Sequence, residues 1–291
     1  MRSLLFVPGD SPSKLDKGMG SGADVLLLDL EDSIAPQRKV EARATTAAFL
    51  KAARQAKDRP RLFVRVNGFT TGLTNDDLDA VVAAQPDGIM LPKAEGGAAV
   101  IHCDAKITAR EAVHGLPDGA LDLIAIATET AAALFLAGSY GGASKRLKGL
   151  TWGAEDLSVE LGAEANRDAQ GHFLAPYQLA RSLCLAGAAA AQVPALDTVY
   201  VDFRNEAGLR RECEEARRDG FTGKMAIHPA QVKPINEVFT PSAEAVQRAE
   251  AVIAAFAQNP DAGTVGIGGV MYDRPHLQRA RQLLARARTA G

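Results

Sequence analysis

Short apolar runs recur along the chain, and segments with helical periodicity lie between them. Each run holds consecutive apolar residues rather than an alternating pattern, which is typical of strands buried on both faces of a parallel sheet. Segments such as Val40–Ala56, Tyr177–Ala191 and Glu206–Arg218 are expected to be helices. Strands that alternate with helices predict an α/β fold, a (β/α)8 TIM barrel, which we favour over a doubly wound open sheet. The eight predicted strands are Ser3–Val7, Val25–Leu30, Leu62–Val66, Gly88–Leu91, Leu123–Ala127, Leu150–Gly153, Thr198–Phe203 and Lys224–Ile227.

The chain continues beyond the eighth predicted strand for longer than a barrel requires. We expect residues 1–240 to form the barrel and residues 241–291 to form a C-terminal helical extension. Within the extension, Ser242–Ala257 and the basic segment His276–Arg288 have helical periodicity. The glycine-rich segment Asn259–Gly269 between them is expected to be a flexible loop. The extension is either a packing element, such as an oligomer contact, or a lid over the active site.

Composition narrows the class of function. The 291 residues include 33 Lys and Arg against 35 Asp and Glu, which argues against nucleic-acid or anionic-membrane binding because both need a basic excess. The three cysteines lie far apart without a C-x-x-C pair, so a disulfide scaffold and a thiolate zinc site are excluded as main features. No apolar run approaches the roughly 20 residues of a membrane span, and the first run is too short for a secretory signal. We therefore expect a cytoplasmic protein that binds neither nucleic acid nor membrane.

Ionisable side chains follow most of the predicted strands. Because the carboxyl ends of the strands meet at one rim of a barrel, these side chains are expected to form a carboxylate-rich active-site mouth. Carboxylates without a His or Cys cluster select a hard, oxygen-binding cation, Mg²⁺ or alternatively Mn²⁺. Glu129 and Asp156, on neighbouring strands, are the expected pair of metal ligands, although each could instead cap a helix or form a surface ion pair. The residues at the strand ends are Asp29, Glu31, Asp32, Arg65, Lys93, Glu129, Glu155, Asp156, Asp202, Arg204 and His228.

For the other residues at this rim the sequence allows more than one role. Arg65 could bind a substrate carboxylate or carbonyl oxygen, or form a structural ion pair with Asp29 or Glu31. Glu31 could support the metal ligands or cap the helix that begins near Pro36, and we favour the first role. Lys93 ends a barrel strand and could form a Schiff base, but a surface or ion-paired lysine is favoured because the carboxylate pair already supplies a metal route. His228 is either a structural histidine or a substrate contact.

Seven motifs in a fixed order identify a resemblance that covers nearly the whole chain. Together they resemble the citrate lyase beta-subunit-like family within the HpcH/HpaI aldolase group, and their pattern is most similar to malyl-CoA and citramalyl-CoA lyases. The motifs are Leu5-Phe6-Val7-Pro8-Gly9, Asp29-Leu30-Glu31-Asp32, Arg65-Val66-Asn67, Leu91-Pro92-Lys93, Glu129-Thr130, Gly153-Ala154-Glu155-Asp156 and Lys224-Met225-Ala226-Ile227-His228-Pro229.

The resemblance implies an activity and an assembly. It implies a Mg²⁺-dependent carbon–carbon lyase that cleaves or forms a carboxylated 3-hydroxyacyl-CoA, with an acyl-CoA and a 2-oxo acid as the products of cleavage. It also implies a homotrimer or homohexamer in which a C-terminal segment covers the active site, often that of a neighbour. The alternatives are the beta subunit of a citrate lyase acting on citryl-acyl carrier protein, a CoA-independent class II 2-oxo-acid aldolase, and a non-catalytic barrel in an assembly.

The resemblance also implies roles for the residues that react. Glu129 and Asp156 match the Mg²⁺ ligands of the family, and Glu129 is expected to lie against the substrate as well. Arg65 matches an arginine that contacts the oxo or carboxylate group of the substrate. Asp273, within a Met-x-Asp-x-Pro segment, resembles the aspartate proposed as the acid/base, with Glu31 as the next candidate.

Contacts to the CoA part of the substrate are implied at two places. Phe6 and Lys17 fall where the malyl-CoA lyases contact CoA, and Ile227 with His228 matches a segment that lines the same site. The malyl-CoA lyases carry an arginine near the position of Pro12, which this chain lacks. Lys14 or Lys17 is therefore expected to take over the phosphate contact.

Overall fold

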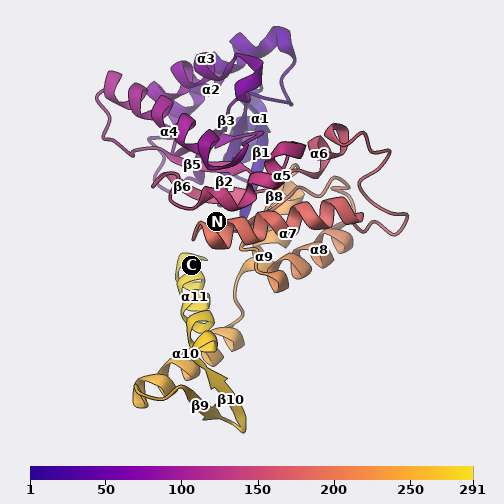
Figure 1. The fold of residues 1–291 in the computed structure, drawn as a ribbon. Helices are drawn as coiled ribbons and strands as arrows, with labels where there is room; N and C mark the ends of the chain where they lie inside the picture. The colour runs from indigo at the N-terminus through magenta and orange to yellow at the C-terminus, as the bar shows by residue number, and fades with distance from the viewer. Residues whose placement is uncertain (291) are drawn as a thin grey trace.

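The computed structural model describes residues 1–290 and places eight parallel strands in one nearly closed barrel surrounded by helices (Figure 1). The strands follow the order β6-β5-β4-β3-β2-β1-β8-β7, and the two edges meet where Leu150 bridges Ala195. The predicted (β/α)8 barrel is thus confirmed. The strands are β1 (Ser3–Pro8), β2 (Val25–Asp29), β3 (Arg61–Arg65), β4 (Gly88–Leu91), β5 (Asp122–Ile126), β6 (Leu147–Thr151), β7 (Leu196–Asp197) and β8 (Gly223–Ala226).

Helices connect successive strands and cover the outside of the barrel (Figure 1). No helix in the described part of the chain is long and apolar enough to cross a membrane. The barrel helices are α1 (Pro12–Met19), α2 (Lys39–Ala53), α3 (Thr74–Val81), α4 (Gly96–Val113), α5 (Ala131–Leu136), α6 (Ala154–Glu160), α7 (Ala175–Ala190), α8 (Glu206–Asp219) and α9 (Val232–Phe239).

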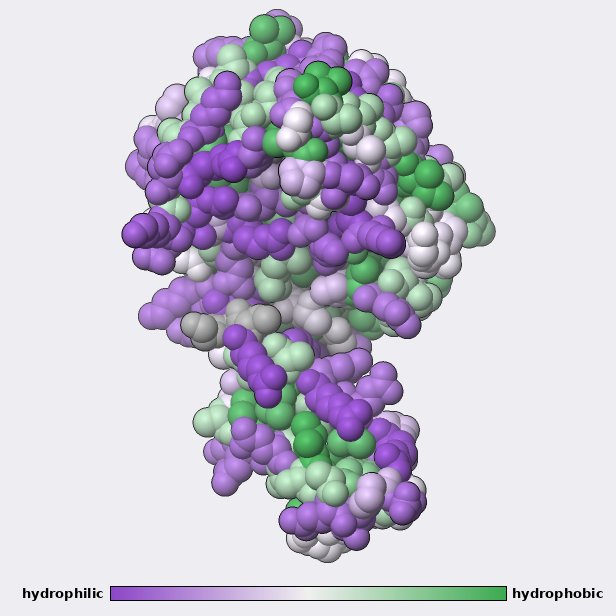
Figure 2. Space-filling view, turned by 90° about the vertical axis from the view of Figure 1, so that its left-hand side faces the viewer, coloured by the Kyte–Doolittle hydropathy of each residue, from purple (hydrophilic) through white to green (hydrophobic). Residues whose placement is uncertain are grey.

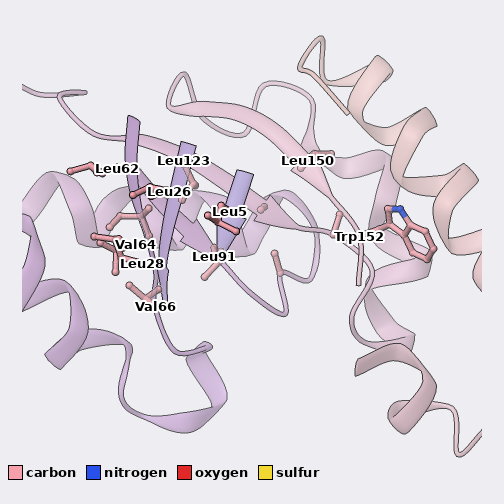
Figure 3. Packing of buried hydrophobic residues seen from close by; sticks show 14 of the residues in the cluster. Leu5, Leu26, Leu28, Leu62, Val64, Val66, Leu91, Leu123, Leu150 and Trp152 are labelled. Atoms are coloured by element: carbon pink, nitrogen blue, oxygen red, sulfur yellow. The ribbon is translucent and has the colours of Figure 1, made fainter. Parts of the chain in front are cut away.

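Both faces of the barrel strands are buried, which explains the unbroken apolar runs in the sequence. Side chains on one face, including Leu27, Phe63 and Met225, fill the barrel interior. Side chains on the other face, including Leu26 and Val64, pack beneath the helices (Figure 3). Because successive residues on a strand point to opposite faces, both layers need apolar residues.

The prediction for the seventh strand is wrong. β7 covers only Leu196–Asp197, and Thr198–Phe203 leaves the sheet as a loop at the rim. This loop is rich in β-branched and aromatic residues, which raised its apparent strand propensity. Val201 and Phe203 are exposed rather than buried between two layers, so tertiary position overrides that propensity.

The C-terminal extension forms a small lobe that stands away from the barrel (Figures 1 and 2). It has its own apolar core, in which Val252, Phe256 and Leu277 pack together. Only a short segment at 240–242 separates α9 from the first helix of the lobe. The lobe consists of α10 (Ala243–Gln258), β9 (Thr264–Ile267), β10 (Val270–Asp273) and α11 (Arg274–Ala290).

The expectation of a flexible glycine-rich loop in the extension is also wrong. Thr264–Ile267 and Val270–Asp273 pair as an antiparallel hairpin. Gly268 and Gly269 both have positive φ, which a two-residue hairpin turn requires and glycine adopts without strain. The glycines therefore serve a tight turn.

A buried ion pair fixes the two-residue strand β7 to its neighbour. The Lys224 ammonium on β8 is fully buried and lies 2.7 Å from both Asp197 of β7 and Glu212 of α8. The Trp152 indole, just after β6, donates to Asp197 over 2.8 Å. Burial opposes the charge on Lys224, but Asp197 more than offsets it and raises the pKa of this lysine. The shortest strand is thus held to β8 by charged groups and to the end of β6 by the Trp152 indole.

Replacement of Lys224 by Met should lower the free energy of unfolding by about 3–5 kcal/mol, because it leaves the Asp197 carboxylate buried without its ammonium partner. Urea denaturation measures the loss, and the exposed Lys233→Met variant should stay near wild type. Adding Asp197→Asn to Lys224→Met should recover part of the stability. A loss below about 1 kcal/mol would contradict a role of the ion pair in holding β7 to β8.

Candidate active site

A cavity of about 420 Å³ opens at the carboxyl ends of the barrel strands. Its wall combines apolar side chains with a group of charged ones, the usual composition of a small-molecule site. The residues that line it are Phe6, Pro8, Asp29, Asp32, Ser33, Arg65, Ile126, Glu129, Gly153, Ala154, Glu155, Asp156, Thr198, Val199, Met225 and Ile227.

Arg65, the last residue of β3, is held by the end of β2. Its Nε and Nη2 donate to the two carboxylate oxygens of Asp29 over 2.7 and 2.8 Å. Its Nη1 lies 3.1 Å from Glu31 and 3.4 Å from Asp32, and its guanidinium carbon lies 4.7 Å from the centre of the Phe6 ring. Burial opposes the charge, but Asp29 outweighs it and raises the pKa of Arg65. The residue is therefore a rigid, permanently charged group in the cavity wall.

Carboxylates from three strand ends meet around one lysine. Lys93 follows β4, and its ammonium lies 2.7 Å from Glu31 and 3.1 Å from Asp156. Its backbone N–H donates to Oε2 of Glu129, which lies just beyond β5. Lys93 has φ of 50°, a left-handed conformation that is uncommon without glycine. Of the alternatives drawn from the sequence, the structure places Lys93 as an ion-paired lysine.

Burial and mutual repulsion raise the pKa of two of these carboxyls. Burial first, then the neighbouring Glu31 and Asp156 charges, raise the pKa of Glu129 to about 8. Burial also raises the pKa of Glu31 to about 7, although Arg65 and Lys93 favour its charged form. Carboxyls with a raised pKa at or beside a cavity are common in functional sites.

Gly153 makes room for the buried Glu129 side chain. A Cβ atom at this position would lie 2.6 Å from Cγ of Glu129, closer than any side chain tolerates. The glycine follows β6 and precedes α6, whose first turn carries Asp156. The local sequence at the end of β6 therefore brings the two carboxylates together.

The donor set in the cavity fits a hard cation. Glu129 and Asp156 both line the cavity, and Oε2 of the buried Glu31 accepts no hydrogen bond. Within residues 1–290, no group of three or more His, Cys, Asp or Glu side chains is arranged to hold a metal ion. Mg²⁺ needs only one or two protein carboxylates because water and substrate oxygens complete its shell. A carboxylate pair is thus sufficient for this ion.

The structure brings most of the sequence-predicted site residues to one place. Phe6, Arg65, Glu129, Asp156 and Ile227 all line the cavity. Glu31, another predicted catalytic residue, does not line the cavity but contacts two residues beside it.

Glu31 is buried and contacts the site through Arg65 and Lys93 rather than by lining the cavity. His228 lies at the rim, where its ring accepts from the Ala230 N–H and stacks on Phe203 at a centroid distance of 4.6 Å.

Two predicted residues lie elsewhere in this chain. Lys17 is exposed in the last turn of α1 and does not line the cavity. Asp273 lies at the end of β10 in the C-terminal lobe, where its side chain pairs with His276. The histidine three residues after the aspartate was a signal for this pair that the sequence analysis did not use.

Thr198 and Val199 line the cavity but were not predicted as site residues. The apolar pattern predicts a strand at these residues, in which they would alternate between the two faces of the barrel. Their role depends on β7 ending at Asp197, which leaves the loop free to turn over the cavity.

Comparisons with known proteins agree with this geometry. A family model described as HpcH/HpaI aldolase/citrate lyase matches residues 2–229. A (3S)-malyl-CoA thioesterase of Cereibacter sphaeroides is 38% identical over 98% of this chain and 94% of its own length. A citrate lyase subunit beta of Leuconostoc mesenteroides is 32% identical over 97% of this chain and 92% of its own length.

The chain is also similar to a protein whose structure has been solved with bound ligands. The protein CitE from Mycobacterium tuberculosis, in complex with magnesium, acetoacetate and coenzyme A, is 33% identical with a TM-score of 0.78. The alignment covers 98% of this chain and 97% of that one. The resemblance found in the sequence motifs is thereby confirmed, and the chain belongs to the HpcH/HpaI aldolase/citrate lyase family.

Proposed function

We propose that this protein is a Mg²⁺-dependent carbon–carbon lyase for a carboxylated 3-hydroxyacyl-CoA such as malyl-CoA or citramalyl-CoA. Cleavage gives an acyl-CoA and a 2-oxo acid, and the reverse reaction condenses them. The observation that carries the proposal is one cavity that holds the carboxylates of Glu129 and Asp156 opposite apolar walls, with Arg65 beside them. The malyl-CoA in the name of the thioesterase relative supports the substrate class, the name of a citramalyl-CoA lyase relative supports the reaction, and the magnesium and coenzyme A of the CitE complex support both ligands.

Glu129 and Asp156 are the proposed ligands of the cation. When bound, Mg²⁺ supplies a Lewis acid for the hydroxyl, oxo and carboxylate oxygens of the substrate. Glu31 is proposed to hold Arg65 and Lys93 in place from behind the cavity. The manganese ion, which prefers the same oxygen ligands, is proposed as a substitute.

Arg65 is proposed to recognise the 2-oxo-acid half of the substrate. Nε and Nη2 of Arg65 donate to Asp29, and Nη1 lies 3.1 Å from Glu31 and 3.4 Å from Asp32 at the cavity wall. A fixed positive charge in a buried wall stabilises charge that develops on a substrate oxygen without reorganising during the reaction. Phe6 and Ile227 are proposed to contact the thioester arm, with His228 at the rim beside them.

Cleavage breaks the bond between the α-carbon of the acyl group and the carbon that bears the hydroxyl. The hydroxyl becomes the carbonyl of the 2-oxo acid, and the bonding electrons pass to the α-carbon and form an enolate. The proton lost by the hydroxyl passes to the acid/base carboxylate and is returned to the α-carbon, so that no proton is gained or lost overall. Asp273 is proposed to deliver the proton to that carbon. Because Asp273 lies in the lobe that stands away from the cavity, it would reach the cavity of a neighbouring copy in a homotrimer or homohexamer, or move with the lobe.

A second candidate is the beta subunit of a citrate lyase, which takes its substrate from an acyl carrier protein. The 32% identity to the Leuconostoc subunit favours it. An assay separates the two: the isolated chain receives Mg²⁺ and a panel of 3-hydroxyacyl-CoA thioesters, and released glyoxylate, pyruvate or oxaloacetate is measured. Turnover of free thioesters supports the lyase, and turnover of citryl-acyl carrier protein alone supports the subunit.

Removal of the cation should abolish activity. Glu129→Gln should lower the affinity for the metal far more than it lowers the thermal stability, because it removes one of the two charged ligands. Activity in excess EDTA, its recovery on adding Mg²⁺ or Mn²⁺, and thermal unfolding measure these effects. Full turnover in EDTA would contradict the metal route. It would favour a Schiff base on Lys93, which borohydride trapping detects.

Arg65→Lys should lower kcat/KM by at least about tenfold, equivalent to roughly 1.4 kcal/mol, because an ammonium cannot reproduce the forked contacts of a guanidinium. Steady-state kinetics give the value, and thermal unfolding reports the loss of the Asp29 pair separately. Wild-type kinetics in a folded Arg65→Lys variant would make Arg65 a structural ion pair only.

Asp273→Asn should fold, assemble and bind Mg²⁺ as wild type does, but lose most of its lyase activity because it lacks the proton donor. Mixing Asp273→Asn with inactive Arg65→Ala should restore part of the activity if the lobe crosses between copies. No restoration would place the lobe over its own barrel. Unchanged turnover of Asp273→Asn alone would reduce the lobe to a packing element and make Glu31 the next candidate.

A further inference from the structure

We infer that Lys93 is a tethered cation that competes with the divalent metal for Asp156 and thereby weakens metal binding. This inference rests on the proposed function, because it takes Glu129 and Asp156 as the metal ligands. Lys93 is here a positioning residue, since its own contacts are to protein carboxylates.

The backbone places Lys93 at the centre of the carboxylates. Its left-handed conformation, at φ of 50°, directs the backbone N–H to Glu129. The side chain then extends past Gly68, where a Cβ atom would lie 3.7 Å from Cδ of Lys93. It ends 2.7 Å from Glu31 and 3.1 Å from Asp156. One residue therefore touches Glu129 through its backbone and Asp156 through its charge.

The distribution of charges places the Lys93 ammonium in competition with a divalent cation for Asp156. Arg65 pairs with carboxylates that follow β2, whereas Lys93 is the cation paired with Asp156 within the described part of the chain. A divalent ion on Asp156 must share that carboxylate with the ammonium or displace it. Two positive charges a few ångströms apart in a partly buried site repel each other by an appreciable energy.

The arrangement has a function in the metal-free protein. The ammonium lies between the Glu31 and Asp156 carboxylates and neutralises part of their charge when no metal does so. The cost of displacing it makes the metal easier to lose, so metal can exchange without unfolding of the cavity. On metal binding, Lys93 keeps its contact to Glu31 and gives up the one to Asp156.

Calorimetric titration of the metal alone, Mg²⁺ and then Mn²⁺, into the full chain without substrate tests the inference. Lys93→Met keeps the length of the side chain and the backbone donor but removes the charge. It should bind the metal at least about tenfold more tightly than wild type. Lys93→Arg should stay within about threefold of wild type. Lys148→Met, on an exposed lysine of β6, removes the same charge away from the cavity and should not change the affinity.

Equal or weaker binding by Lys93→Met would overturn the inference. Thermal unfolding gives a second readout, because Mg²⁺ should raise the Tm of Lys93→Met more than that of wild type at the same concentration. If Lys93→Met does not fold, Lys93→Gln carries the same expectation. Failure of both to fold at any Mg²⁺ concentration would make Lys93 a structural requirement and also overturn it. Absence of metal binding in wild type would instead remove the proposed function itself.

Discussion

Compensation of buried negative charge is the constraint on which the site depends. The strand ends bring several carboxylates into one partly enclosed cavity, where water cannot screen their repulsion. Arg65 neutralises the group that follows β2, and Lys93 joins that group to Asp156 after β6. The raised pKa of Glu129 indicates that compensation around it is incomplete. A site with uncompensated negative charge is one that attracts a cation, and this links the electrostatics of the barrel to the proposed chemistry.

The barrel could be predicted from the sequence because its strands are buried on both faces and leave unbroken apolar runs. The failures came where a local pattern competed with tertiary position. Thr198–Phe203 has the residues of a strand but forms a loop of which Thr198 and Val199 line the cavity, and the glycines at 268 and 269 serve a hairpin turn. Neither outcome can be read from propensity, because each depends on which neighbour the segment meets.

In the candidate site, too, the sequence pattern predicts which residues meet at the rim but not the contacts that they make there. The ionisable residues at strand ends could be assigned to one rim because the topology of a parallel barrel requires it. The contacts among them could not, because Glu31 and Asp156 follow strands that are far apart in sequence and are joined only by the reach of Lys93. The sequence also left the position of Asp273 open, since the lobe has its own core and its placement does not follow from its residues.

The shortness of β7 has a consequence for the dynamics of the cavity. A two-residue strand offers few backbone hydrogen bonds, so the seam between β7 and β8 has a short ladder to resist local opening and depends on the Lys224–Asp197 pair instead. The loop that leaves β7 carries Thr198 and Val199, which form part of the cavity wall. Amide hydrogens along this seam should therefore exchange with solvent sooner than those of β1 or β2, which have long ladders on their shared side. Local opening between β7 and β8 would therefore also move the part of the cavity wall that Thr198 and Val199 form.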